Sequence, residues 1–234
     1  MKYLCIAILL TLLCASAANS MENQKHLFIL SGQSNMARLD PGLSFTPTVE
    51  AAFGKDNVTI VKDAMSGQPI SRWYKKWNPP HGDAPIETGD LYDRLMKKVN
   101  LAISDNNFST VTFVWMQGER DALLENGEVY AASLRGLIAQ LAEDLRRKDI
   151  NLVIGRLSDF DLADEKYPHW TRVRKAQVEV AEAYPRGRWV DTDDLNDGLN
   201  AEGKLLHNDL HYSVDGYKAF GNRLAEACIL LIRQ

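Results

Sequence analysis

Five short apolar runs recur along the chain. They cover residues 27–30, 58–61, 111–116, 152–157 and 189–190 and are rich in valine, isoleucine and phenylalanine. Apolar residues in these runs follow one another without alternating with polar ones, as in strands that are buried on both faces. Such strands occur in parallel sheets covered by helices on each side, so we predict a mostly parallel sheet.

Helical periodicity fills the segments between these runs. Residues 90–104 carry Leu91, Leu95 and Val99 at the spacing of one helix face. The same kind of pattern recurs over residues 129–147, 173–183 and 214–232. Strands that alternate with helices predict an α/β sandwich.

Two stretches, residues 37–56 and 68–88, show neither pattern and hold most of the prolines. We predict that both are long loops, which in compact domains are often functional. In open parallel sheets, ligands bind beyond the carboxyl ends of the strands. Polar residues that directly follow a predicted strand are therefore the first candidates for a site.

The amino-terminal residues differ in kind from the rest. Lys2 precedes an apolar segment, which small residues follow at 15–18. This order is typical of a secretory signal peptide, and the apolar segment is short for a membrane span. We predict a signal peptide over residues 1–20, one domain over residues 21–234, a secreted or periplasmic location, and no membrane span in the mature chain.

Composition supports a globular chain and argues against one class of partner. Of the 234 residues, 45% are hydrophobic and 25% are charged, which is enough apolar material for a sizeable core. The net charge is −4 with both signs interspersed, whereas nucleic-acid binding calls for a basic face. Cys228 is the only cysteine beyond the predicted signal peptide, so we predict a buried thiol and no disulfide in the mature chain.

Ser34 follows the first predicted strand, after the small-residue turn formed by Ser31, Gly32 and Gln33. A turn of this kind presents a serine hydroxyl at the edge of a sheet, where it can act as a nucleophile. Serine is also a common helix N-cap. The turn alone favours neither interpretation.

A second polar cluster, Gln117-Gly118-Glu119, directly continues the third strand. The Gln117 amide could stabilise an oxyanion, and the Glu119 carboxylate could orient a histidine. Alternatively, Glu119 and Asp121 are acids in the first turn of a helix, where they interact favourably with its dipole.

His211 lies on a predicted loop just before the last helix, for which Ser213 is a suitable N-cap. A general base needs such a place and a carboxylate that fixes it, and Asp209 or Glu119 could accept its Nδ1–H. His207 and His211 also invite a zinc interpretation. A catalytic zinc needs three protein ligands and no third is apparent, so we predict no metal.

The loop after the second strand contains Gly67, which could bring a backbone N–H close to a ligand. Trp73, Tyr74 and Trp77 follow in the same loop. Aromatic rings of this kind either stack on sugars or cover the core.

Together these motifs resemble the SGNH-hydrolase superfamily. The motifs are Gly32-Gln33-Ser34-Asn35-Met36, Gly67 with Ile70 and Trp73, Trp115-x-Gln117-Gly118-Glu119-x-Asp121, and Leu210-His211-Tyr212. Within the superfamily the chain resembles the sialate O-acetylesterase-like branch, which includes the acetyl xylan esterases of carbohydrate esterase family 6. The resemblance implies a flavodoxin-like α/β/α sandwich with a five-stranded parallel sheet, and ester hydrolysis without metal or cofactor.

The resemblance also implies roles for individual residues. Ser34 is then the nucleophile and His211 the general base. The backbone N–H groups of Ser34 and Gly67 and the side chain of Gln117 form the oxyanion hole. We further expect four side chains to contact the substrate: Gln33, Asn35, Arg72 and Trp73.

The acid that orients His211 stays open between two residues. The superfamily places an aspartate three residues before the histidine, and that position is Asn208 here. Glu119 takes the role in esterases similar to family 6, and Asp209 is the alternative. We favour Glu119.

These inferences predict a secreted esterase that removes O-acetyl groups from a poly- or oligosaccharide through an acyl-enzyme on Ser34. Two alternatives remain. The first is a carbohydrate-binding protein of the same fold that has lost turnover, motivated by Asn208. The second is an esterase for lipids or thioesters, which the polar, tryptophan-rich loop over residues 71–77 disfavours.

Overall fold

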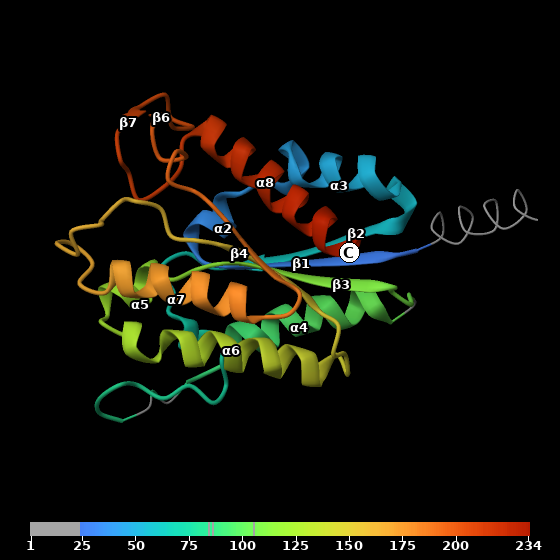
Figure 1. Cartoon of the computed structure of the whole chain (residues 1–234), viewed down its shortest axis with the longest axis horizontal. Coiled ribbons are helices and arrows are strands. Elements are labelled where there is room, and N and C mark those ends of the chain that lie inside the picture. The colour runs from blue at the N-terminus through green and yellow to red at the C-terminus, as the bar shows by residue number, and fades with distance from the viewer. Residues whose placement is uncertain (1–23, 84, 86, 105) are drawn as a thin grey trace, which may run out of the picture.

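The computed structural model describes residues 24–234 with the exception of residues 84, 86 and 105 (Figure 1). The predicted signal peptide lies outside the described residues. Five parallel strands form the central sheet. They are β1 (His26–Gly32), β2 (Val58–Ala64), β3 (Thr110–Met116), β4 (Asn151–Gly155) and β5 (Gly187–Val190).

The strands lie in the order β2-β1-β3-β4-β5. This order confirms the predicted parallel sheet and is that of flavodoxin-like folds, in which the chain changes direction between β1 and β3. The carboxyl ends of all strands therefore meet at one edge, which points to the left in Figure 1.

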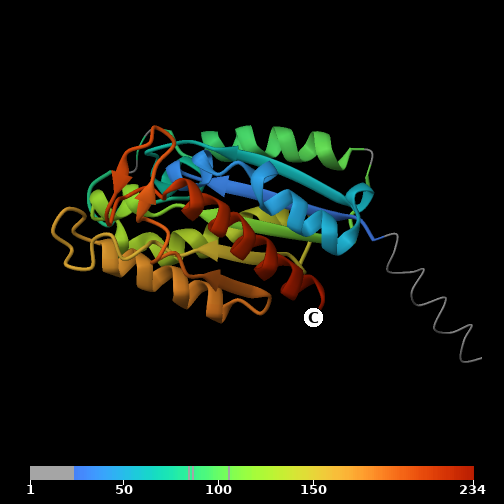
Figure 2. The same ribbon diagram turned by 90° about the horizontal axis from the view of Figure 1, so that it is seen from above.

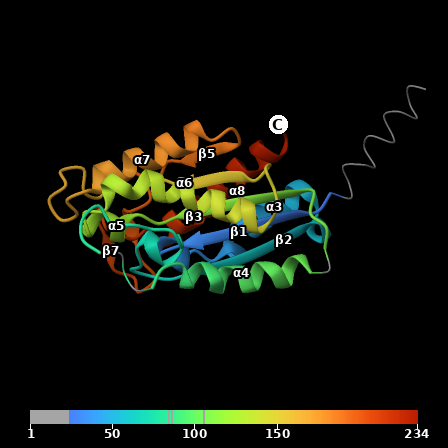
Figure 3. The same cartoon turned by 90° about the horizontal axis from the view of Figure 1, so that it is seen from below.

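Helices cover both faces of the sheet and complete the predicted three-layer sandwich. Helices α3 (Phe45–Phe53) and α8 (Val214–Ile232) lie on one face (Figure 2). The other face carries α4 (Asp90–Ile103), α6 (Gly127–Asp144) and α7 (Trp170–Ala183) (Figure 3).

The buried surface of each element follows the sequence pattern. All seven residues of β1 are buried, because helices pack on both faces of this strand. In α4, the predicted apolar face is buried through Leu91, Leu95 and Val99. Cys228, on the inner face of α8, is buried as predicted.

One predicted loop is wrong in part. Residues 37–56 contain α3 between two short 3-10 turns, η1 (Pro41–Leu43) and η2 (Lys55–Asn57). Phe45 and Val49 bury one face of α3. Pro47 does not prevent the helix, because it lies in the first turn, where a backbone N–H has no partner within the helix. In residues 68–88, as far as they are described, the regular structure is η3 (Ile70–Arg72).

Short elements gather at the carboxyl edge of the sheet. They are α2 (Ser34–Arg38), α5 (Glu119–Leu123) and the hairpin of β6 (Gly198–Leu199) and β7 (Leu205–Leu206). None of the described helices has both the length and the apolar character required to cross a bilayer.

Candidate active site

A cavity of about 240 Å³ opens at the carboxyl edge of the sheet. It brings together residues from α2, the loop after β2, α5, the loop before α7 and the loop before α8. Its lining residues are Gln33, Ser34, Arg38, Ser66, Gly67, Glu119, Arg120, Leu123, Tyr167, Leu210 and His211. Five predicted site residues lie around this one cavity: Gln33, Ser34, Gly67, Glu119 and His211.

Gly32 determines how β1 delivers Ser34. Its φ of +142° lies outside the usual range of other residues, and a Cβ built there would be 1.8 Å from the Met116 carbonyl oxygen. Gln33 N–H then donates to that same carbonyl at 2.9 Å. The chain therefore turns tightly over the end of β3 before α2 begins.

The N-cap interpretation of Ser34 is wrong. The N-cap of α2 is Gln33, and Ser34 is the first residue of the helix. Ser34 is 6% exposed and lines the cavity. Within the described part of the chain its hydroxyl has no hydrogen-bond partner, so the fold leaves it available to a ligand.

Gly67 lines the cavity and has a φ of +70°. No atom would lie within 4 Å of a Cβ at this position, so the backbone conformation rather than space requires glycine. The loop is fixed nearby, because Ile70 N–H donates to Asp121 Oδ2 at 2.8 Å.

Gln117 does not line the cavity. It is fully buried, and its Nε2 donates to Asp121 Oδ2 at 2.6 Å, to the Gln68 carbonyl at 3.1 Å and to Gln33 Oε1 at 3.2 Å. Its amide thus joins β1, the loop after β2 and α5 beneath the cavity. The predicted oxyanion role of Gln117 stays a prediction.

Asp121 is buried at the centre of this network. Its carboxylate accepts hydrogen bonds from Gln117, from Ile70 N–H and from Asn126 Nδ2 at 3.2 Å. Burial raises its pKa to about 6, although the hydrogen bonds oppose that shift. The first-turn position predicted for Asp121 is confirmed, but most of its contacts reach outside the helix.

His211 is partly buried beside Asp209. Asp209 Oδ1 accepts the His211 backbone N–H at 2.9 Å and lies 3.9 Å from Nδ1, beyond hydrogen-bond length. Burial lowers the pKa of His211, the Arg38 guanidinium lowers it further, and Asp209 opposes both. The imidazole is therefore neutral near pH 7, the form that can accept a proton.

Glu119 acts on the histidine loop through Asn35. Asn35 Nδ2 donates to Glu119 Oε1 at 3.0 Å and to the Leu210 carbonyl at 3.1 Å, next to His211. Tyr217 Oη donates to Asn35 Oδ1 at 2.9 Å. No direct bond joins Glu119 to His211 among the described residues. The identity of the orienting acid stays a prediction.

The second Glu119 oxygen, Oε2, is buried without a hydrogen-bond partner among the described residues. Burial is the main cause that raises the pKa of Glu119 to about 7. The carboxyl group therefore loses its proton less readily than an exposed glutamate does.

Asn208, at the position of the superfamily aspartate, forms its side-chain hydrogen bonds with Asn196 and Phe160. Its Oδ1 accepts from Asn196 Nδ2 at 3.0 Å and its Nδ2 donates to the Phe160 carbonyl at 3.2 Å. His207 is 93% exposed and its Nδ1 lies 3.1 Å from Asp197. In the described part of the chain, no three His, Cys, Asp or Glu side chains are grouped to hold a metal ion.

Three of the expected substrate contacts need correction. Trp73 is fully buried and packs edge-on against Trp115 at 5.3 Å, so it belongs to the core. Asn35 is 1% exposed and is engaged by the network described above. Arg72 pairs with both carboxylate oxygens of Asp90 at 2.5 Å and does not line the cavity.

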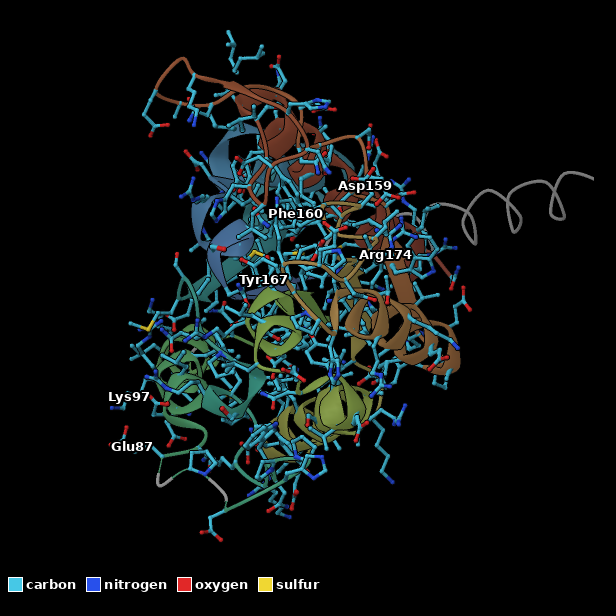
Figure 4. The ribbon with its side chains drawn as sticks, turned by 90° about the vertical axis from the view of Figure 1, so that its left-hand side faces the viewer. Glu87, Lys97, Asp159, Phe160, Tyr167 and Arg174 are labelled. Atoms are coloured by element: carbon cyan, nitrogen blue, oxygen red, sulfur yellow. The ribbon has the colours of Figure 1, made fainter. Side chains whose placement is uncertain are left out.

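The lining residues that the sequence did not predict include Arg38, Arg120 and Tyr167. Arg38 and Arg120 are exposed, and neither guanidinium forms an ion pair with a described residue. Tyr167 contacts Phe160 at 5.7 Å in an edge-to-face arrangement, on the loop before α7 (Figure 4). Arg120 lies inside the Gln-Gly-Glu motif region and could have been noticed, whereas Tyr167 carried no signal in the sequence.

The fold and the grouping of these residues define an SGNH-type hydrolase. The family model described as carbohydrate esterase, sialic acid-specific acetylesterase, matches residues 37–230. The chain belongs to this family. No curated protein sequence matches it.

Several solved structures share the fold. A protein from Arabidopsis thaliana matches with a TM-score of 0.65 and 19% identity over 89% of this chain and 98% of that one. NanS matches with a TM-score of 0.62 and 14% identity over 90% and 98%. XAC1771, a carbohydrate acetylesterase from Xanthomonas citri, matches with a TM-score of 0.62 and 16% identity. The match covers 86% of this chain and 55% of the XAC1771 chain. At these identities the likeness shows the fold.

Proposed function

We propose that this chain is a secreted serine esterase that removes O-acetyl groups from carbohydrates. The observation that carries the proposal is the joint position of Ser34 and His211 on one small cavity. The Ser34 hydroxyl is unpartnered within the described residues, and the lowered pKa of His211 keeps its imidazole neutral. The family and the fold of known carbohydrate acetylesterases support this chemistry.

The reaction proceeds in two halves. Ser34 Oγ attacks the acetyl carbonyl carbon while His211 accepts the hydroxyl proton, and the oxyanion is stabilised by N–H donors that include the backbone of Ser34 and Gly67. The sugar oxygen then leaves with the proton from His211. Water repeats the sequence on the acyl-enzyme and releases acetate.

The size and charge of the cavity support a small acyl group on an acidic sugar. A volume of about 240 Å³ suits acetyl better than a long acyl chain, which disfavours a lipid or thioester substrate. The guanidinium groups of Arg38 and Arg120, which have no ion-pair partner in the described part of the chain, would attract a carboxylate. We therefore propose an acetylated acidic sugar, such as a sialic acid, as the substrate.

The test is acetate release from O-acetylated sialic acid and from acetylated xylan, with Ser34→Ala as the control. We expect the wild-type protein to release acetate from the acidic sugar. In Ser34→Ala the rate of release should fall about 10⁴-fold or more, since the nucleophile is absent. A rate in Ser34→Ala like that of the wild type would overturn the assignment.

One observation favours a second candidate, a carbohydrate-binding protein without turnover. His211 Nδ1 forms no hydrogen bond with a carboxylate of the described residues, and Asp209 is 3.9 Å away. Binding of acetylated sugar without acetate release over hours would establish this function instead.

A secreted or periplasmic location is part of the proposal and rests on the leader-like sequence of residues 1–20. Mass determination of the amino terminus of the expressed protein tests it. Cleavage after Ala17, Ala18 or Ser20 is expected, and a retained Met1 would contradict it.

A further inference from the structure

The Gln33 amide is held in one orientation by groups that donate. Its Oε1 accepts from Arg120 N–H at 3.2 Å, from Gly118 N–H at 3.5 Å and from Gln117 Nε2 at 3.2 Å. A backbone N–H cannot accept a hydrogen bond. Exchanging the oxygen and nitrogen of Gln33 would therefore place donors against donors, so the oxygen faces α5 and Nε2 is turned away from it.

Gln33 Nε2 opens on the cavity. The residue is only 3% exposed, yet it lines the cavity next to Ser34. Nε2 has no hydrogen-bond partner among the described residues. Part of its surface is nevertheless accessible, because it is absent from the fully buried, unpartnered side-chain atoms. The accessible part of this nitrogen therefore belongs to the cavity surface, and its N–H groups are free to donate there.

Gln117 is in the opposite situation. Its Nε2 carries two hydrogens, and three acceptors already surround it: Asp121 Oδ2, the Gln68 carbonyl and Gln33 Oε1. The residue is fully buried. The Gln33 amide is therefore accessible to an oxyanion in the cavity, whereas the Gln117 amide is buried and does not line the cavity.

We propose that Gln33, and not Gln117, supplies the side-chain N–H of the oxyanion hole. The proposal rests on the esterase function above. As Ser34 Oγ bonds to the carbonyl carbon, the electron pair of the C=O double bond moves to oxygen, and Gln33 Nε2–H hydrogen-bonds that oxygen. The pair returns when the carbonyl forms again and the sugar oxygen leaves with the His211 proton. Gln117 is then a positioning residue, which holds Gln33 Oε1.

Two substitutions distinguish two roles of Gln33: donating an N–H to the oxyanion, and holding the surrounding segments in place by accepting their hydrogen bonds, which we call bracing. Gln33→Glu keeps an oxygen for the three donors and has the same size, but it has no N–H. Gln33→Met lacks both the acceptor and the donor. Gln140→Glu is the matched control, because Gln140 is a side chain on α6 that does not line the cavity.

The experiment measures kcat and KM on an aryl acetate, the affinity for a trifluoromethyl ketone that forms an anionic adduct with serine, and the melting temperature. We expect kcat to fall about 10²–10³-fold in both Gln33 variants, the size of losing one oxyanion donor. Ketone affinity should fall in parallel, while KM changes little. Gln140→Glu should retain the wild-type rate.

Bracing alone predicts that Gln33→Glu keeps its rate and Gln33→Met loses it, which would overturn the proposal. A loss confined to Gln33→Glu would indicate only an effect of charge and would overturn it too. If Gln33→Met does not fold, the test rests on Gln33→Glu alone. Unequal losses of ketone affinity and of kcat/KM in that variant would then overturn the proposal. Failure of the esterase function itself is recognised separately, by absent wild-type turnover or an active Ser34→Ala.

Discussion

At the scale of single residues, the site is defined by which polar atoms the fold leaves without a partner. The hydroxyl of Ser34 and the Nε2 of Gln33 stay free among the described residues, while Gln117 and Asn35 are fully engaged. Glu119 and Asp121 are buried carboxyl groups with raised pKa values of about 7 and about 6. Both connect loops around the cavity. Among the described carboxylates, Asp209 is the one within 4 Å of a ring nitrogen of His211.

The pH dependence of activity belongs to this scale. Because burial and Arg38 both lower the pKa of His211 below 6.5, kcat/KM on a neutral ester should rise with pH and reach half its maximum below 6.5. Arg38→Ala removes a positive charge and should move this midpoint to higher pH. Asp209→Asn removes a negative charge and should move it lower, each by less than about one unit.

A pH–rate profile of the three proteins on an aryl acetate checks these shifts. A wild-type midpoint above 6.5, or midpoints that move in the opposite directions, would show that another group controls the rate.

At the scale of elements, the turn from β1 to α2 is the most constrained part of the site. The Met116 carbonyl occupies the place of a Cβ at Gly32 and accepts the N–H of Gln33. The end of β3 therefore sets the position of both Gln33 and Ser34. Loops are fixed to this turn through Asn35 and Gln117, which reach the loop before α8 and the loop after β2.

Gly32→Ala should consequently destabilise the fold and abolish activity. The added Cβ must displace the end of β3, and the backbone φ is unfavourable for alanine, so we expect a loss of about 3 kcal/mol in the free energy of unfolding. Gly203→Ala is the control, because Gly203 has a φ of +75° but no atom within 4 Å of its Cβ position.

Urea unfolding and aryl acetate hydrolysis measure both effects. Equal stability losses in the two variants would mean that backbone strain, and not the contact with Met116, limits position 32.

At the scale of the whole molecule, the flavodoxin-like strand order brings distant segments to one edge. The cavity combines residues that are up to 178 positions apart in sequence, from Gln33 to His211. Although the chain carries a net charge of −4, two guanidinium groups without described ion pairs face this cavity. These two positive charges are the reason that we propose an anionic substrate.

Substrate selectivity tests this charge arrangement. Arg38→Ala and Arg120→Ala should each raise KM for an acetylated acidic sugar about tenfold or more, since a hydrogen bond to a charged group contributes about 1.5–3 kcal/mol. KM for a neutral aryl acetate should change little. Arg135→Ala, an exposed arginine of α6 outside the cavity, is the control. Equal changes on both substrates would contradict recognition of a carboxylate.

The sequence by itself determined the sheet, its helices and the segments that form the site. Buried strands are recognisable because apolar residues follow one another in them without regular alternation, and polar residues at the strand ends stand out against that background. The prediction of a loop over residues 37–56 was wrong at α3, because the prolines in this stretch suggested a loop although a short amphipathic pattern is present. These features are local, and local spacing is what a sequence displays.

Only the tertiary structure decided which polar atoms face the cavity. Ser34 and His211 were expected to meet, and the strand order places them on one cavity. The burial of Trp73, the engagement of Asn35 and Gln117, and the exposure of Arg38 and Arg120 depend on contacts between segments far apart in the chain. Hydrogen-bond partners across such distances leave no periodic pattern in the sequence. The orientation of the Gln33 amide therefore follows only from the folded chain, which brings the N–H groups of Gly118 and Arg120 to its oxygen.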